Sequence, residues 1–198
     1  MSEEEYIYEL VTKEDEEAKQ QWIDKVIAAF ILLYLLEKQR FALEKKVKGV
    51  EDDEDVITKY ALYLNRLLLS FLDRMTLLTK ENARREALHQ ITTNWERFYR
   101  TEKQDAVLSA QLSVAQFYEQ VKGYTVKKTW KSQNDALVCE VCRAMNGTTL
   151  ALDEPFLYNG QVVELASGKL FQYNYKDRYV PIAHPNDRCT IIFTIEQE

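Results

Sequence analysis

Residues 121–130, VKGYTVKKTW, mark the point at which the character of the chain changes. Residues 1–121 contain no proline and a single glycine, whereas all three prolines and four of the five glycines follow. Because proline and glycine are the strongest helix breakers, the first part of the chain can form long helices. The sequence therefore predicts an α+β protein, with a helical arm over residues 1–121 and a small, mostly antiparallel β domain over residues 122–198.

Three long helices are expected in the arm, over about residues 14–47, 55–78 and 81–122. The second and third each carry apolar residues at steps of three and four positions, which is typical of a helix with one buried stripe. The stripes consist of Val56, Tyr60, Tyr63, Leu64, Leu67, Phe71 and Met75, and of Ala106, Leu108, Ala110, Leu112, Val114, Ala115, Phe117 and Val121. We interpret both as ordinary helix packing.

The formal net charge of -6 argues against general binding of duplex DNA, because such binding depends on neutralising phosphates. The acids gather in residues 3–17, with eight acids and one lysine, and in EDDED at 51–55. Such runs are typical of solvated surface or linker. The most apolar run, VIAAFILLYLL at 26–36, is shorter than the ~20 residues that span a membrane. We expect no secretion signal and no membrane association, and interpret the run as a buried or partner-facing helix.

The β domain is expected to contain strands within YTVKKTW, QVVEL, KLFQYNY and CTIIFTI. Asn146-Gly147, Asn159-Gly160 and Ser167-Gly168 favour hairpin turns, because glycine readily adopts a positive φ. A domain of this size has a marginal hydrophobic core, so a covalent or metal staple would help it to fold.

All three cysteines and one of the two histidines lie in two short segments of this domain. Cys139 and Cys142 form a CxxC pair, which places two sulfurs on one side of a tight turn. His184 and Cys189 could complete a Cys3His set for zinc, with Asp187 as a substitute ligand or as a carboxylate that orients the histidine. Gly147 follows the CxxC pair where the backbone of such a knuckle needs freedom.

Two other interpretations remain open for these residues. The three thiols could pack in reduced form without a metal, or the CxxC pair could be a redox site, although the βαβ context of thioredoxin-like sites is missing. A filled four-ligand site leaves no position for a catalytic water, and no catalytic motif is apparent, so we predict that the protein is not an enzyme. His89 has no candidate partner in the sequence and is expected to be an ordinary helix residue.

Lysines surround Trp130, and no acid occurs from residue 121 to 134. Lys127, Lys128 and Lys131 could therefore contact nucleic acid or an acidic partner, although such strand faces are more commonly just solvated.

The order of several short motifs resembles the phage head-morphogenesis family, the Mu F-like minor head proteins of tailed bacteriophages. The similarity covers about residues 95–195, roughly half of the chain. The matching motifs are RTE (100–102), Gly123, KKTW (127–130), Asp135, VCEVCRAMNG (138–147), PF (155–156) and HPNDRCTI (184–191).

The resemblance implies a minor virion protein, carried in few copies and acting in procapsid and head assembly at the portal vertex. It would be made in the host cytoplasm and would associate with the portal protein, with other head or scaffold proteins, and with copies of itself through the helical arm. In some phages such proteins accompany DNA during packaging or ejection. A zinc-knuckle module that binds phage DNA is the alternative, and a metal-dependent nuclease using His184 and Asp187, or a thiol redox protein, ranks third.

The resemblance also bears on individual residues. Cys139, Cys142, His184 and Cys189 match the family motifs, whereas Asp187 stands where the usual H-P-x-C-R-C motif has its first cysteine. Arg100, Thr101 and Glu102 match the helix motif, and we expect Arg100 or Glu102 to cap a turn of the β domain. Trp130 is expected to anchor the core, and Asp135 to accept hydrogen bonds from backbone N–H groups of a turn.

Overall fold

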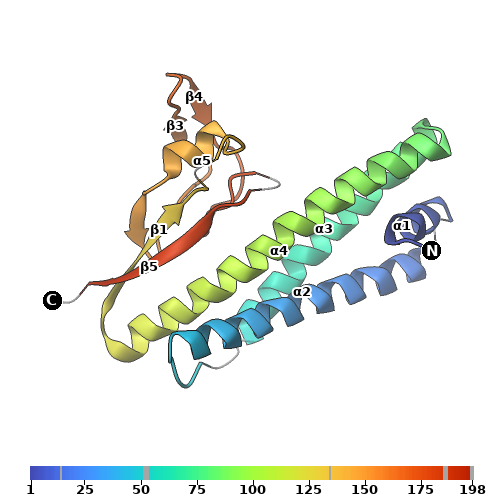
Figure 1. Cartoon of the computed structure of the whole chain (residues 1–198). Coiled ribbons are helices and arrows are strands. Elements are labelled where there is room, and N and C mark those ends of the chain that lie inside the picture. The colour runs from blue at the N-terminus through green and yellow to red at the C-terminus, as the bar shows by residue number, and fades with distance from the viewer. Residues whose placement is uncertain (14, 51–53, 134, 185–186, 197–198) are drawn as a thin grey trace. The chain divides into compact units, whose positions relative to one another are not determined.

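The fold is α+β, as the sequence predicts (Figure 1). A computed structural model describes residues 1–13, 15–50, 54–133, 135–184 and 187–196. Four helices come first: α1 (Glu3–Thr12), α2 (Glu16–Glu44), α3 (Glu54–Glu81) and α4 (Arg84–Lys122). The expected helix start at Glu14 and the first three residues of the EDDED run lie outside the described residues.

The chain folds into two compact units, and the boundary between them does not lie at residue 121. The first, here called the helical unit, comprises residues 1–33 and 51–102, and the second, the αβ unit, comprises residues 34–50 and 103–198. The helices α2 and α4 each contribute one part to each unit. The second half of α4 belongs to the αβ unit because Leu108 and Leu112 are buried in the same core as the β strands.

The acid-rich N-terminus forms the helix α1 and is not a linker, whereas its four acids are not buried, in agreement with the expected solvated surface. Ser2 and Glu5 form a capping box, with Glu5 N–H donating to the Ser2 hydroxyl at 3.2 Å and Ser2 N–H donating to the Glu5 carboxylate at 3.0 Å. The opposite side of the helix buries Ile7, Leu10 and Val11. The helix therefore packs these three side chains into the core of the helical unit, and Glu3 accepts a hydrogen bond from the Trp22 indole N–H at 2.8 Å at the edge of that core.

The core of the helical unit combines residues from four helices. Partly buried aromatic side chains pack against it: Trp95 stacks on Phe98 with ring centroids 5.5 Å apart and also contacts Phe71 at 5.8 Å. Its buried members are Ile7, Leu10, Val11, Trp22, Ile23, Leu68, Phe71, Leu72, Met75 and Ile91. The predicted stripe of α3 is thus correct for Phe71 and Met75, whereas Val56 at the start of the helix is exposed.

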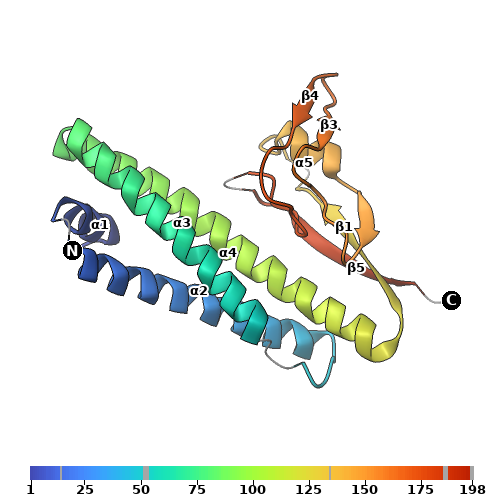
Figure 2. The same ribbon diagram turned by 180° about the vertical axis from the view of Figure 1, so that it is seen from behind.

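A three-stranded antiparallel sheet organises the αβ unit, in the order β2-β1-β5. The strand β1 (Thr125–Lys131) lies between β2 (Thr149–Ala151) and β5 (Thr190–Glu196), and Figures 1 and 2 show β1 and β5 side by side along their length. A separate hairpin contains β3 (Val162–Glu164) and β4 (Leu170–Gln172), and the short helix α5 (Glu140–Met145), which was not expected, precedes β2.

Two of the predicted turns, Ser167-Gly168 and Asn146-Gly147, have different roles. Gly168, with a φ of 76°, closes the β3–β4 hairpin as predicted. Asn146-Gly147 does not form a hairpin, because it joins α5 to β2 with backbone angles of a type II turn, in which Thr148 N–H donates to Met145 O at 3.0 Å. Gly147 N–H also donates to Trp130 O at 2.8 Å, which ties this turn to β1.

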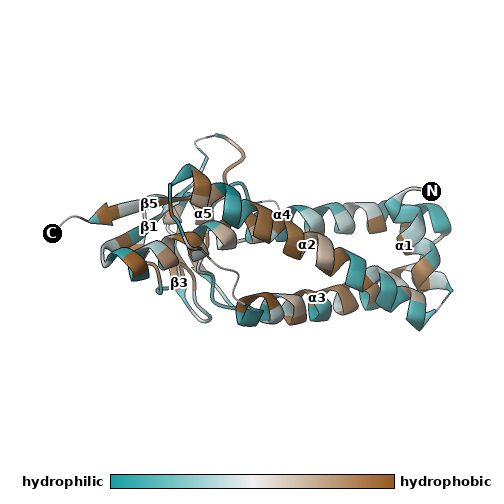
Figure 3. Cartoon of the chain, turned by 90° about the horizontal axis from the view of Figure 1, so that it is seen from below, coloured by the Kyte–Doolittle hydropathy of each residue, from teal (hydrophilic) through white to brown (hydrophobic). Residues whose placement is uncertain are grey.

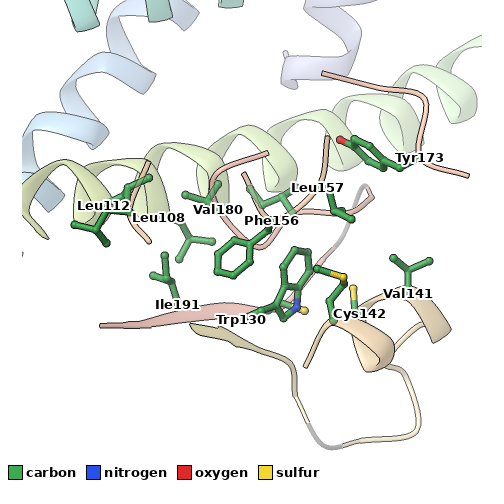
Figure 4. Packing of buried hydrophobic residues seen from close by; sticks show 14 of the residues in the cluster. Leu108, Leu112, Trp130, Val141, Cys142, Phe156, Leu157, Tyr173, Val180 and Ile191 are labelled. Carbon is green, nitrogen blue, oxygen red and sulfur yellow. The ribbon is translucent and has the colours of Figure 1, made fainter. Parts of the chain in front are cut away.

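Trp130 anchors the core of the αβ unit, as predicted, and is fully buried. Figure 4 shows its indole ring among Phe156, Cys142 and Ile191, with Leu108 and Leu112 of α4 on the same side of the core as Val180. The rings of Trp130 and Phe156 meet edge to face, with centroids 5.4 Å apart. This core holds the CxxC helix α5 and the start of β5 against a common set of side chains.

The apolar run at 26–36 lies in the middle of α2, whose hydrophobic character is apparent in Figure 3. Phe30 and Tyr34 are buried, whereas Leu32 and Leu36 are 57% and 56% exposed. Within the described parts of the chain, no helix combines the length and the apolar character needed to cross a membrane.

Candidate metal centre

The CxxC pair lies at the beginning of α5. Cys139 is the N-cap residue, and its sulfur accepts a hydrogen bond from the backbone N–H of Cys142 at 3.2 Å. Serine, threonine and aspartate make the same contact at other helix N-termini. The cap therefore turns the Cys139 side chain back towards Cys142, so both sulfurs lie on the same side of the first turn.

The second segment leads into β5, with His184 in the preceding loop and Cys189 directly before the strand. A side chain from α4 fixes the end of this loop, because the Gln104 amide donates to Cys189 O at 2.7 Å. Asp187 N–H donates to His184 O at 3.2 Å, which tightens the turn between the two donor residues.

The two segments meet. His184 Nε2 lies 3.0 Å from Cys139 Sγ and 3.5 Å from Cys142 Sγ. Two groups of potential donor atoms, Cys139–Cys142–His184 and Cys142–Asp187–Cys189, each lie within 4.8 Å of one another. Because Cys142 belongs to both groups, these five residues form one cluster that could bind a metal.

Asp187 differs from the other four residues because both of its oxygens already accept hydrogen bonds from the protein. Its Oδ1 accepts from Cys189 N–H at 2.7 Å, and its Oδ2 accepts from Ala183 N–H at 2.9 Å and from the Cys142 thiol at 3.0 Å. The side chain is almost completely buried. Its carboxylate therefore holds the loop around His184 and Cys189 in shape.

The environment of Cys142 disfavours a bare thiolate. A hydrogen bond with Cys189, burial and the nearby Asp187 carboxylate all raise the pKa of the Cys142 thiol. A bound divalent cation acts in the opposite direction, because it favours deprotonation of its thiol ligands. A metal bound by these residues would therefore stabilise the deprotonated form of Cys142.

Asp135 and Arg188 connect the two segments at the edge of the cluster. The Asp135 carboxylate accepts from Leu137 N–H at 2.9 Å, which is the turn-capping contact expected for it, and from the Arg188 guanidinium at 2.7 Å. The Arg188 hydrogen bond lowers the pKa of Asp135. Arg188 and Gln133 also line a small hollow that reaches the donor atoms of Cys139 and His184.

The RTE motif makes its contacts in the helical unit. Arg100 pairs with Glu96 at 3.2 Å, the Thr101 hydroxyl donates to Arg97 O at 2.8 Å, and buried Glu102 accepts from Tyr63 Oη at 3.4 Å. The expectation that Arg100 or Glu102 caps a turn of the β domain stays a prediction.

Gln104 and Asp105 hold the loops of the αβ unit. Gln104 binds Cys189 O, and the Asp105 carboxylate pairs with the Arg178 guanidinium at 3.1 Å. The sequence gives no direct signal for this pair, because 73 positions separate the two residues.

The three lysines do not share one exposed face, which corrects the predicted basic patch. Lys128 is fully buried, and its ammonium donates to Leu152 O at 2.8 Å. Lys127 is partly exposed and pairs with Glu196 at 2.6 Å, and Lys131 is exposed. Because side chains alternate along a strand, Lys128 lies on the same side of β1 as Val126 and Trp130.

The cysteine and histidine motifs on which the family resemblance partly rests thus gather at one place in the αβ unit, and the RTE motif lies elsewhere. The likeness to phage head-morphogenesis proteins remains a prediction from those motifs. Comparison of the whole chain with protein-family models, with curated proteins and with solved structures finds no match.

Proposed function

We propose that the protein is a non-enzymatic minor head protein of a tailed bacteriophage, whose αβ unit is stapled by a structural zinc ion. Cys139, Cys142, His184 and Cys189 would hold the ion, and Asp187 would position their loop. The observation that carries the proposal is the convergence of two segments more than 40 residues apart on one cluster of sulfur and imidazole donors.

A structural role for the metal follows from the chemistry of the donors. Three thiolates and one imidazole fill the tetrahedral coordination of zinc and leave no position for a substrate or a nucleophilic water. The oxygens of Asp187 are engaged by Ala183 N–H and Cys189 N–H, so this carboxylate is poorly placed to act as a base. The metal would instead join α5 to the start of β5.

The metal assignment is tested by elemental analysis of protein purified without chelators or nickel resin. One zinc per chain is expected. Replacement of the zinc by cobalt should then give the intense visible absorption of a tetrahedral, sulfur-rich site. The proposal of a structural zinc site would be wrong if the purified protein contained no stoichiometric metal and took up neither zinc nor cobalt.

The head-assembly role is supported by the motif resemblance and by apolar surface on the helices. Leu32 and Leu36 on α2, and Leu62 and Leu69 on α3, are large exposed apolar side chains. Residues of this kind commonly mark protein contacts when they recur along one helix. In the proposed role, the portal protein or another copy of the chain would cover them.

Co-expression with the portal protein of the same phage tests the assembly role. Co-purification is expected, and it should weaken when Leu32 and Leu36 are both replaced by glutamine. Particles that assemble normally without incorporating the protein would count against the proposal.

The nucleic-acid alternative has less support. Burial of Lys128 removes one of its three proposed contacts, and Lys127 is already paired with Glu196. DNA binding that falls steeply with salt, and falls further on Lys131→Gln, would revive it.

A further inference from the structure

A second cavity in the αβ unit lies away from the metal-binding residues. It has a volume of about 230 Å³ and is bounded by the end of α2, the second half of α4, β1 and β5. Nine residues line it: Phe41, Lys45, Val47, Val114, Ala115, Tyr118, Val126, Phe193 and Ile195.

The wall formed by Val47 depends on the way in which α2 ends. Lys46 adopts a left-handed conformation with a φ of 55°, and Val47 N–H donates back to Ala42 O at 2.9 Å. These are the features of a Schellman motif, which folds the residue after the cap back onto the helix. The motif places Val47 against the cluster of Phe41, Ala42 and Val114.

One charged side chain lines the cavity, and the Glu119 carboxylate contacts a lining residue by accepting a hydrogen bond from Val126 N–H at 2.8 Å. Among the described residues that line it, Lys45 alone is charged, and its ammonium lies 5.3 Å from the centre of the Phe41 ring. Lys46 and Lys48 are exposed on the same segment. The Lys45 ammonium also pairs with Glu44 at 2.9 Å, and this ion pair is exposed, so another carboxylate can readily replace Glu44.

We propose that this cavity binds a small carboxylate with an apolar body, such as a medium-chain or aromatic acid. The apolar body would lie between Phe41, Val114 and Phe193, and the carboxylate would pair with Lys45. An apolar cavity of about 150 Å³ accommodates benzene, so the present volume admits a ring or a short chain with one polar group. It lies below the ~300–1,000 Å³ of most pockets for drug-sized ligands, which favours a small molecule.

The test uses the full-length protein with octanoate as the probe. Methyl NMR of Val47, Val114, Val126 and Ile195 should show saturable shifts at millimolar octanoate. Octylammonium, which has the same chain and the opposite charge, should bind more weakly. Lys45→Gln should weaken octanoate binding about threefold without affecting 1-octanol, whereas the matched control Lys131→Gln should change neither.

The proposal is wrong if octanoate causes no saturable methyl shifts, or if octanoate and octylammonium bind equally well. A further variant, Ala115→Leu, should fill the cavity with a larger side chain. Undiminished octanoate binding by this variant, in its folded form, would also contradict the proposal. If the methyl shifts depend on protein concentration in the absence of octanoate, a second copy of the chain binds at the cavity, and the small-molecule proposal is wrong. None of the substituted residues belongs to the proposed zinc site, so the zinc content should be the same in every variant and the two proposals can fail independently.

Discussion

His184 Nε2 lies 3.0 Å from Cys139 Sγ, although 45 positions separate the two residues. The contact joins the N-terminus of α5 to the loop before β5, and both segments also pack on the core around Trp130. Bringing such distant segments together costs more chain entropy than forming a local contact does. A bound ion at this point would offset that cost and stabilise the αβ unit, because it binds the folded state in preference to the unfolded one.

The two histidines offer a matched pair of variants for the metal site. His184→Gln should abolish stoichiometric zinc, whereas His89→Gln, at an exposed position of α4, should retain it. If zinc is normally present at about a thousand times its dissociation constant, its loss lowers the free energy of unfolding by about 4 kcal/mol. Elemental analysis and urea denaturation of both variants check this expectation, and equal zinc contents would contradict it.

Asp187 is predicted to position the loop without being a required ligand. Asp187→Ala leaves the buried N–H groups of Ala183 and Cys189 without their acceptor, which should cost about 2–3 kcal/mol of stability. Asp187→Asn retains one acceptor oxygen and should cost less. Zinc stoichiometry should stay near one in the Asn variant, and a stoichiometric loss there would show that the carboxylate itself binds the metal.

The burial of Lys128 should make the free energy of unfolding depend on pH. Burial lowers the pKa of Lys128 from its ordinary value of 10.5 to about 8. Between these two pH values the unfolded state holds a proton that the folded state has released, so the free energy of unfolding rises with pH. Below pH 8 Lys128 is charged in both states, and burying that charge lowers the free energy of unfolding by about 3 kcal/mol, which is the energy equivalent of the pKa difference.

Comparison with Lys128→Met isolates this effect, since all other titrating groups are common to both proteins. The stability of the wild-type protein relative to the variant should increase between pH 8 and 10, as measured by urea denaturation. A difference that does not change with pH would show that Lys128 titrates normally.

Lys46→Gly is expected to stabilise the end of α2. A side chain in the left-handed region is strained, and glycine adopts this conformation without that strain, so the gain should be about 0.5–1 kcal/mol. Lys48→Gly, in the same segment but without a positive φ, should give no gain. Thermal or urea unfolding of the two variants distinguishes the conformational effect from the simple removal of a positive charge.

Some features that we did not predict nevertheless have a local signal in the sequence. The Ser2–Glu5 capping box and the spacing of Ile7, Leu10 and Val11 indicate α1, but the number of acids suggested a linker. The burial of Lys128 follows from its alternation with Val126 and Trp130 along one strand. In both cases the periodicity of the segment, and not its composition, determines which side chains face the core.

The sequence by itself determined the change from helices to strands near Gly123 and the identity of the sulfur and imidazole donors. Both are local properties, set by glycine and proline content and by the spacing of a few reactive side chains. Only the tertiary structure decided that the second half of α4 belongs to the αβ unit, that Asp105 pairs with Arg178, and that Val47 closes a cavity against Phe193. These contacts join positions far apart in the chain, and they depend on how whole elements pack rather than on any local preference.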